Sequence, residues 1–171
     1  VLFRSLFHLF PRYLIGLSAT PYRTDGFDSL FDLYFGIHRV HRSLYRPHNV
    51  LQVVTKTKID HTLDKQGNIN WNSVIDQQCN LDSRKELICK YCMEYKDRNI
   101  LILCKRIQQM LNICERLEEL GVKDVAVFKE SDTSFDTNCR ILVSSYQKVG
   151  TGFSFDKLDM LILGTDTEEY F

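Results

Sequence analysis

Small hydroxyl side chains and basic side chains follow apolar runs at several points of this sequence. The triplet Ser18, Ala19 and Thr20 follows one such run, and Lys105 and Arg106 follow another. Hydroxyl groups at a strand end can reach a phosphate group without steric conflict, and basic side chains form charge-assisted hydrogen bonds with phosphate oxygens. These residue types therefore favour the binding of a phosphate-bearing ligand.

A third group of such residues lies nearer the C-terminus. Ser145 ends an apolar run, and Gly150, Gly152 and Ser154 follow it. A Gly-x-Gly segment lets the backbone approach a ligand closely, because neither glycine carries a Cβ atom. Taken alone, each of the three groups is also typical of an ordinary turn at a strand end.

Charge is distributed unevenly along the chain. Residues 37–58 contain three Arg, two Lys and three His but no Asp or Glu, whereas residues 130–171 contain eight acidic and three basic residues. The zero formal net charge is therefore a sum of opposed regions and argues against a uniformly basic surface. The basic stretch, with Arg39, Arg42 and Arg46, is either a solvated face or a track for nucleic acid.

The composition is that of a folded protein. The chain has 171 residues, of which 44% are hydrophobic, with eleven Phe and eight Tyr, so we expect a packed core in one domain and part of another. Six cysteines occur without a preceding secretory signal, which favours free thiols in a reducing, intracellular compartment, the cytoplasm or the nucleus. No segment is long and apolar enough to predict a membrane span.

The pair Cys89 and Cys92 has the C-x-x-C spacing that opens many zinc sites. Structural zinc needs a second pair of ligands at suitable spacing, and the remaining Cys and His residues offer none. We therefore predict no metal site and interpret both cysteines as positions on an amphipathic helix.

Apolar runs and helical periodicity alternate along the chain. The pattern predicts buried strands at residues 100–104, 125–128, 141–144 and 160–163, and helices at 83–95 and 107–120, the first of them capped by Ser83. Such alternation predicts an α/β fold with a parallel sheet flanked by helices. Between residues 128 and 140 only a polar loop fits.

The flanking segments predict shorter elements. Phe27 to Tyr34 has the spacing of a short helix that Gly36 ends, and residues 65–68 have the composition of a turn. Further strands are expected at residues 13–17, 37–40 and 50–55, which are apolar or β-branched.

In order along the chain, three segments resemble the motifs of superfamily 2 helicases. G-L-S-A-T-P-Y-R-T-D-G resembles motif III, and I-L-I-L-C-K-R-I-Q-Q-M-L-N-I-C-E-R-L resembles the strand and helix of motif IV. R-I-L-V-S-S-Y-Q-K-V-G-T-G-F-S-F-D-K-L-D-M-L-I-L is similar to motif V and the next strand. The narrower resemblance is to the helicases of large cytoplasmic DNA viruses, which adds a viral replication site to the expected locations.

The resemblance implies RecA-like lobes. Residues 1–36 would be the C-terminal part of a first lobe, 37–60 a basic connection, and 61–171 most of a second lobe. In the family, the motif III hydroxyls of Ser18 and Thr20 couple nucleotide state to lobe closure. Residues at the positions of Lys105 and Arg106 approach the nucleic-acid backbone.

Motif V implies two further roles. Ser145 matches the hydroxyl that binds a phosphate of the tracked strand, and Gly150 and Gly152 would lie near the nucleotide. Ser154 stands where the family usually has an Asp near the ATP ribose, and Asp156 lies two residues later. This departure affects the nucleotide-facing half of the motif.

Several parts of the family's catalytic machinery are absent from the sequence. There is no P-loop, since no Gly-Lys occurs, and there is no Asp-Glu box and no arginine-finger motif. Phosphoryl transfer depends on these parts for positioning and charge stabilisation. We therefore expect an intact parent that uses ATP and Mg²⁺ to move on a nucleic acid, with DNA favoured over RNA as the identity of that partner. We expect the 171-residue chain alone to bind neither cofactor and to hydrolyse no ATP.

Two alternatives stay open. The chain could be a complete, catalytically inactive RecA-like module that binds nucleic acid or protein, or an unrelated nucleotide-binding α/β domain. The apolar start at Val1, without an initiator Met, favours part of a longer polypeptide.

Overall fold

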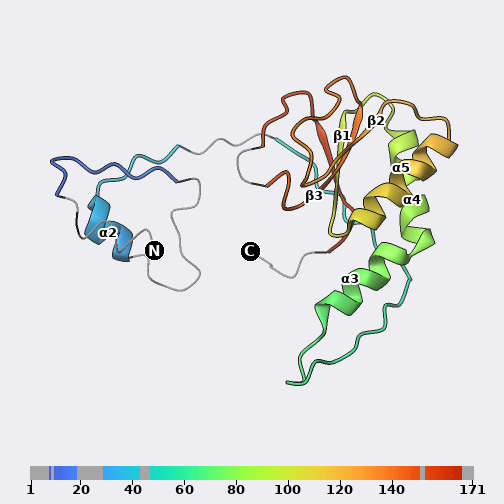
Figure 1. Cartoon of the computed structure of the whole chain (residues 1–171), viewed down its shortest axis with the longest axis horizontal. Coiled ribbons are helices and arrows are strands. Elements are labelled where there is room, and N and C mark those ends of the chain that lie inside the picture. The colour runs from blue at the N-terminus through green and yellow to red at the C-terminus, as the bar shows by residue number, and fades with distance from the viewer. Residues whose placement is uncertain (1–7, 9, 19–28, 43–46, 151–152, 167–171) are drawn as a thin grey trace. The chain divides into compact units, whose positions relative to one another are not determined.

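The chain forms two compact units, Val1–Val53 and Val54–Phe171, and each is described by itself (Figure 1). The computed structural model describes residues 8, 10–18, 29–42, 47–150 and 153–166. The predicted division at residues 36 and 60, into the edge of one lobe, a connection and a second lobe, stays a prediction.

The first unit contains the predicted short helix. Helix α2 spans Ser29–Phe35 and ends at Gly36, whose N–H donates to the carbonyl oxygen of Asp32 at 2.9 Å. Gly36 has φ 77°, a left-handed conformation that suits glycine at the end of a helix.

The strands predicted at residues 13–17, 37–40 and 50–55 are wrong, because no strand forms among the described residues that precede residue 100. Tyr13 is 76% exposed and Leu17 is 94% exposed, so the first of these segments is not buried either. A strand needs a neighbour to pair its backbone N–H and C=O groups. Apolar, β-branched composition shows that a segment suits a strand, but it does not supply the neighbour.

The second unit is an α/β domain with a parallel sheet of four strands in the order β2-β3-β1-β4, so the predicted fold class is confirmed. Figure 1 shows helices α4 and α5 against the sheet, as expected of a RecA-like domain. The elements are α3 Trp71–Asn80, α4 Asp82–Glu94, β1 Ile100–Cys104, α5 Ile107–Glu119, β2 Val125–Phe128, β3 Ile141–Ser145 and β4 Met160–Leu163.

The two faces of the sheet are covered differently. Alternate residues of β1, such as Ile100 and Ile102, pack with α4 and α5 in the larger core, where Met110 and Leu117 are fully buried. The other face carries a smaller cluster built on Leu142, and its cover comes from aromatic side chains of loops and strand ends: Phe128, Phe135, Phe153 and Phe155. The predicted loop between β2 and β3 is confirmed, since residues 129–140 contain no helix.

The start of α4 differs from the prediction. Helix α3 precedes it, and Leu81 is both the C-cap of α3 and the N-cap of α4, without a side-chain hydrogen bond. Ser83, predicted as the cap, therefore lies inside α4. The first turn carries Asp82, whose charge suits a helix N-terminus. The predicted turn at residues 65–68 is confirmed, with Gly67 at φ 85°.

All six cysteines are free thiols, and five are buried. Burial raises the pKa of Cys92, Cys104 and Cys114 to about 12, because the low-dielectric core disfavours the thiolate. Cys89 lies with Cys92 on the buried side of α4, in keeping with an amphipathic helix. Within the part of the chain that the structure describes, no three His, Cys, Asp or Glu side chains group as a metal site requires.

These thiols predict a loss of stability at alkaline pH. A thiol whose folded pKa is raised stays protonated in the folded state while the unfolded chain ionises, so stability is present below the ordinary value of 9.0 and is lost as pH rises towards about 12. We expect the urea midpoint to fall through this range. The variant Cys92→Ala should have a lower urea midpoint at every pH, and its midpoint should fall less steeply as pH rises. An unchanged slope would contradict the contribution of the buried Cys92 thiol to the pH dependence.

Candidate functional site

Residues that follow β1, β3 and β4 lie together at one edge of the sheet. Because all strands are parallel, their carboxyl ends meet there, and ligands of open α/β sheets bind at such edges. Lys105 and Arg106 follow β1, Tyr146 follows β3, and Gly164 follows β4.

A hollow of about 460 Å³ opens at this edge. Its wall combines α3, the start of α5 and the segments after β1, β2 and β3. The lining residues are Asp76, Cys79, Asn80, Lys105, Arg106, Ile107, Gln108, Glu130 and Gln147. A second hollow of about 540 Å³ shares Asp76 and Asn80 with the first, so both extend along α3. Lys105 and Arg106, both predicted to contact nucleic acid, thus lie together in one hollow.

Arg106 has well-defined partners. It is the N-cap residue of α5, and its Nε donates to Oδ1 of Asp76 at 2.7 Å, while Nη2 donates to Oδ1 of Asn72 at 3.0 Å. The Lys105 ammonium lies 5.5 Å from the centre of the Tyr146 ring. This cation–π contact directs the Lys105 side chain from the end of β1 towards the residue that follows β3. No side chain caps the start of α5, so its first turn adds partial positive charge to the hollow.

Ser145 is buried, and its hydroxyl holds the loops at the edge together. Oγ donates to Oε1 of Glu130 at 3.1 Å and accepts the backbone N–H of Lys148 at 3.1 Å. Lys148 Nζ in turn donates to the carbonyl oxygens of Glu130 and Asp132. The predicted phosphate contact of Ser145 stays a prediction.

The other predicted residues are placed as follows. Gly150 is exposed and follows the turn after β3, and Ser154 Oγ donates to Oδ1 of Asp156 at 3.2 Å. In the unit Val1–Val53, Ser18 and Arg42 are exposed, and Arg39 forms an ion pair with Asp32 of α2. The remaining predicted residues, Ala19, Thr20, Arg46 and Gly152, lie outside the described residues.

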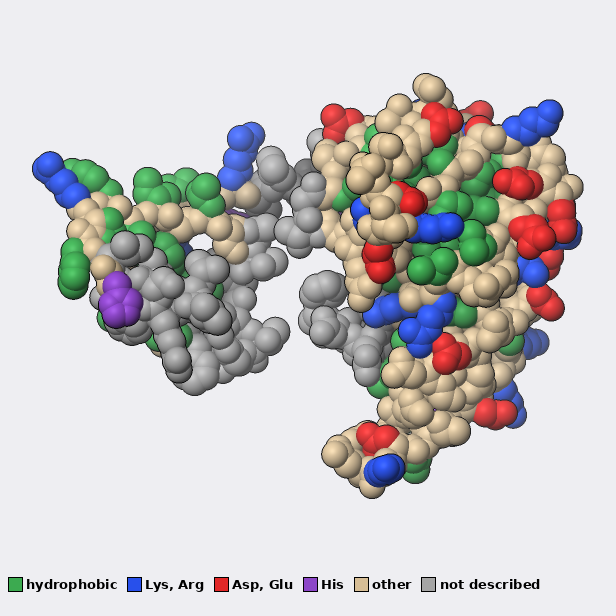
Figure 2. Space-filling model, viewed as in Figure 1, with side chains coloured by type: hydrophobic (Ala, Val, Ile, Leu, Met, Phe, Trp, Pro, Cys, Tyr) green, Lys and Arg blue, Asp and Glu red, His purple; other side chains and the backbone are tan. Residues whose placement is uncertain are grey.

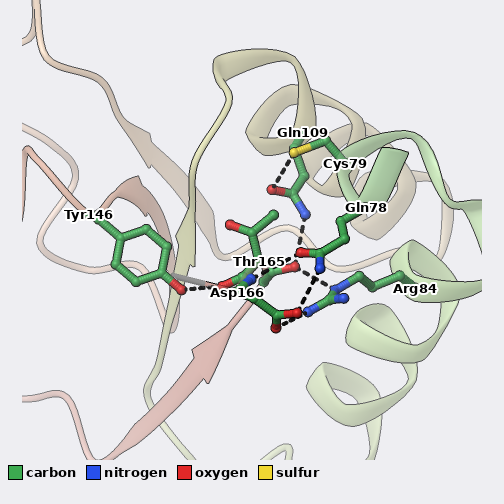
Figure 3. Close-up of polar contacts among 8 residues, drawn as sticks. Gln78, Cys79, Arg84, Gln109, Tyr146, Thr165 and Asp166 are labelled. Atoms are coloured by element: carbon green, nitrogen blue, oxygen red, sulfur yellow. Dashed lines mark hydrogen bonds and ion pairs between the residues drawn. The ribbon is translucent and has the colours of Figure 1, made fainter. Parts of the chain in front are cut away.

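Sequence reasoning missed the segment that leaves β4 (Figure 3). Arg84 of α4 donates from Nε to the carbonyl oxygen of Gly164 at 2.7 Å and from Nη2 to Oδ1 of Asp166 at 3.2 Å. Gln78 of α3 donates to Oδ2 of Asp166 at 2.6 Å and accepts the Asp166 N–H at 3.0 Å. Side chains of α3 and α4 thus hold this segment through its backbone groups and through the carboxylate of Asp166.

Two further side chains hold the same segment. Gln109 of α5 donates to the carbonyl oxygen of Gly164 at 3.1 Å, and Cys79 Sγ donates to Oε1 of Gln109 at 3.4 Å. Tyr146 donates from its hydroxyl to the carbonyl oxygen of Thr165 at 2.6 Å, and burial raises the pKa of this phenol to about 12. We call Gln78, Arg84, Gln109 and Tyr146 the β4 clamp.

Gly164 is required by close packing. A Cβ atom there would lie 2.9 Å from the carbonyl oxygen of Leu103 and 3.2 Å from Sγ of Cys104. The signal that could have located the clamp is the Gly-Thr-Asp triplet directly after an apolar run, together with glutamines on otherwise apolar helix faces.

Both charges occur around the site. Figure 2 shows acidic and basic side chains interspersed over the visible face of the second unit. The hollow repeats this pattern, since Asp76 and Glu130 line it beside Lys105 and Arg106. Within the described residues, no helix has the length and apolar character needed to span a membrane.

The fold and the site define the second unit as a parallel α/β domain with polar residues at the carboxyl ends of its strands. No protein-family model matches the chain. It is 37% identical over 188 aligned positions to "Putative helicase 161L" of Invertebrate iridescent virus 6, covering 99% of this chain and 42% of that protein. It is 33% identical over 171 positions to "Putative helicase 055L" of Frog virus 3 (isolate Goorha), an alignment that covers 98% of this chain and 40% of that protein.

A third relative matches a shorter part. "Putative helicase 109L" of Invertebrate iridescent virus 3 is 49% identical over 51 residues, which are 30% of this chain and 16% of that protein. The chain spans about two fifths of the length of the first two curated relatives. The predicted resemblance is confirmed as similarity to viral proteins that carry the name helicase. Its assignment to superfamily 2 and to individual motifs stays a prediction.

The β4 clamp predicts a stability difference between two arginines. Arg84, with a side chain 25% exposed, binds a backbone carbonyl and a carboxylate, whereas Arg98 pairs with Asp159 at the opposite sheet edge and is 57% exposed. We expect Arg84→Ala to cost about 1–3 kcal/mol of unfolding free energy and Arg98→Ala less than about 1 kcal/mol, measured by urea unfolding. Equal costs would show that the clamp holds no better than a surface ion pair.

Proposed function

We propose that this chain is part of an ATP-dependent superfamily 2 helicase or translocase, and that its second unit binds the phosphate backbone of a DNA strand at the hollow beside α3. The observation that carries the proposal is the position of Lys105 and Arg106. Both follow β1 and line the hollow with the start of α5. Cations beside a helix N-terminus form a favourable site for a phosphate group.

Two further observations support the proposal. The two relatives that align with nearly the whole chain carry the name helicase. The hollow is open, and together with the second hollow it extends along α3. This shape suits a nucleic-acid strand better than an enclosed small molecule.

ATP and Mg²⁺ belong to the proposed activity of the longer protein. The sequence holds no P-loop motif whose backbone amides and Lys would cradle the phosphates. We propose that the chain alone does not hydrolyse ATP and that its role is to hold the strand while other parts supply the chemistry. Ser18 and Thr20 would couple ATP hydrolysis to the hold on the strand. Gly150, Gly152 and Ser154 would lie near the nucleotide.

The proposal predicts that charge at the hollow sets binding to single-stranded DNA. The double variant Lys105→Gln/Arg106→Gln should weaken binding of a fluorescent oligothymidine at low salt. The salt slope, log K against log salt concentration, should become shallower by about 0.7–1.4, since one or two phosphate contacts are lost. Fluorescence anisotropy across a salt series measures both quantities.

The matched control removes the same two charges at the opposite edge of the sheet. Lys96 and Arg98 are exposed and precede β1, so Lys96→Gln/Arg98→Gln should change the affinity and the slope much less. Equal effects of the two double variants would mean that only net charge matters, and no binding by the unaltered chain would overturn the proposal.

A further inference from the structure

The arginine that lines the hollow is already bound to an anion. Asn72 and Asp76 are four residues apart on α3, so their side chains share one face of that helix. Both accept hydrogen bonds from Arg106, Asp76 from Nε at 2.7 Å and Asn72 from Nη2 at 3.0 Å.

These two contacts occupy one of the two edges of the guanidinium that can bind a phosphate in bidentate fashion. Arginine binds carboxylate and phosphate through pairs of parallel N–H groups, and the Nε–Nη2 edge is one such pair. The same edge cannot bind Asp76 and a phosphate group at once. A phosphate that uses this edge must therefore displace Asp76.

The exposure of the pair makes such exchange feasible. The Arg106 side chain is 40% exposed and the Asp76 side chain 57% exposed. Exposed ion pairs are weak because water screens them. A strand that is held at several points can displace Asp76, whereas a single phosphate ion gains too little from one contact to do so.

The other charged groups facing the hollow do not take this role. Glu130 accepts the hydroxyl of Ser145 and belongs to the loop after β2. Lys105 is directed towards the Tyr146 ring. Asp76 is the acidic residue that contacts Arg106, and it lines both hollows.

We propose that Asp76, assisted by Asn72, is an internal competitor for Arg106 and determines the selectivity of the hollow. It excludes lone phosphate ions and releases Arg106 to a polyanionic strand. The inference rests on the proposed function and deepens it, since it names the residue that sets affinity and ligand preference at the same site.

The test is the isosteric variant Asp76→Asn, which keeps an oxygen for Arg106 but removes the competing charge. We expect it to bind oligothymidine about three- to tenfold more tightly than the unaltered chain at about 0.1 M salt, because the phosphate no longer displaces an ion pair. Inorganic phosphate should also compete with the oligonucleotide at lower concentrations than in the unaltered chain.

The control for net charge is Glu119→Gln. Glu119 is 58% exposed, pairs with Arg116, and ends α5 at the far end from the hollow, about 18 Å away at 1.5 Å per residue. This distance exceeds the Debye length of about 10 Å at 0.1 M salt, so its effect on affinity should be small at that ionic strength. Urea unfolding of each variant verifies that it is folded.

A double variant tests whether the effect passes through Arg106. In the background Arg106→Gln, the substitution Asp76→Asn should no longer increase affinity. Equal or weaker binding by Asp76→Asn alone would overturn the inference and show that Asp76 holds Arg106 in its binding position. An increase that persists without Arg106, or that Glu119→Gln reproduces, would overturn it as well.

The results separate this inference from the proposed function. If Lys105→Gln/Arg106→Gln weakens binding more than its control while Asp76→Asn brings no gain, only the competition fails. If the hollow variants behave like their control, the nucleic-acid site itself fails.

Discussion

Parallel pairing of β1 with both β3 and β4 is the constraint on which the rest of the second unit depends. Because the central strand runs in the same direction as its neighbours, everything that follows a strand arrives at one edge. Lys105 and Arg106, Ser145 and the segment from Gly164 become neighbours although they are far apart in sequence. The same pairing brings Gly164 against the carbonyl oxygen of Leu103, where only a glycine fits.

Much of the sheet unit could be predicted from the sequence, because its determinants are local. Continuous apolar runs identified all four strands, and helical periodicity identified α4 and α5. Helix α3 was missed because its residues between Trp71 and Asn80 are mostly polar, and its buried positions are few. Residues 50–55 have the composition of a strand but pair with nothing described, since pairing depends on a partner that composition does not reveal.

The basic residues of the candidate site could be predicted from the sequence, but the residues that contact them could not. Lys105 and Arg106 are recognised by side-chain type and position after a strand. Asp76 and Arg84 belong to other elements, and their contacts follow from tertiary packing alone. The zero net charge found in the sequence has a local counterpart here, because two acidic and two basic residues line the hollow. Attraction of a polyanion therefore depends on how these charges are arranged.

The order of the strands also has a consequence for how the unit forms during synthesis. β1 is the first strand of the sheet to be made, yet it lies in the interior and pairs with the last two. Ile100 pairs with Ile141 and Met160, so β1 of a nascent chain stays unpaired until β3 and then β4 have been synthesised. The helices α4 and α5 flank β1 in sequence and pack on its residues in the core. They are thus the elements available to shield this strand before its partners emerge from the ribosome.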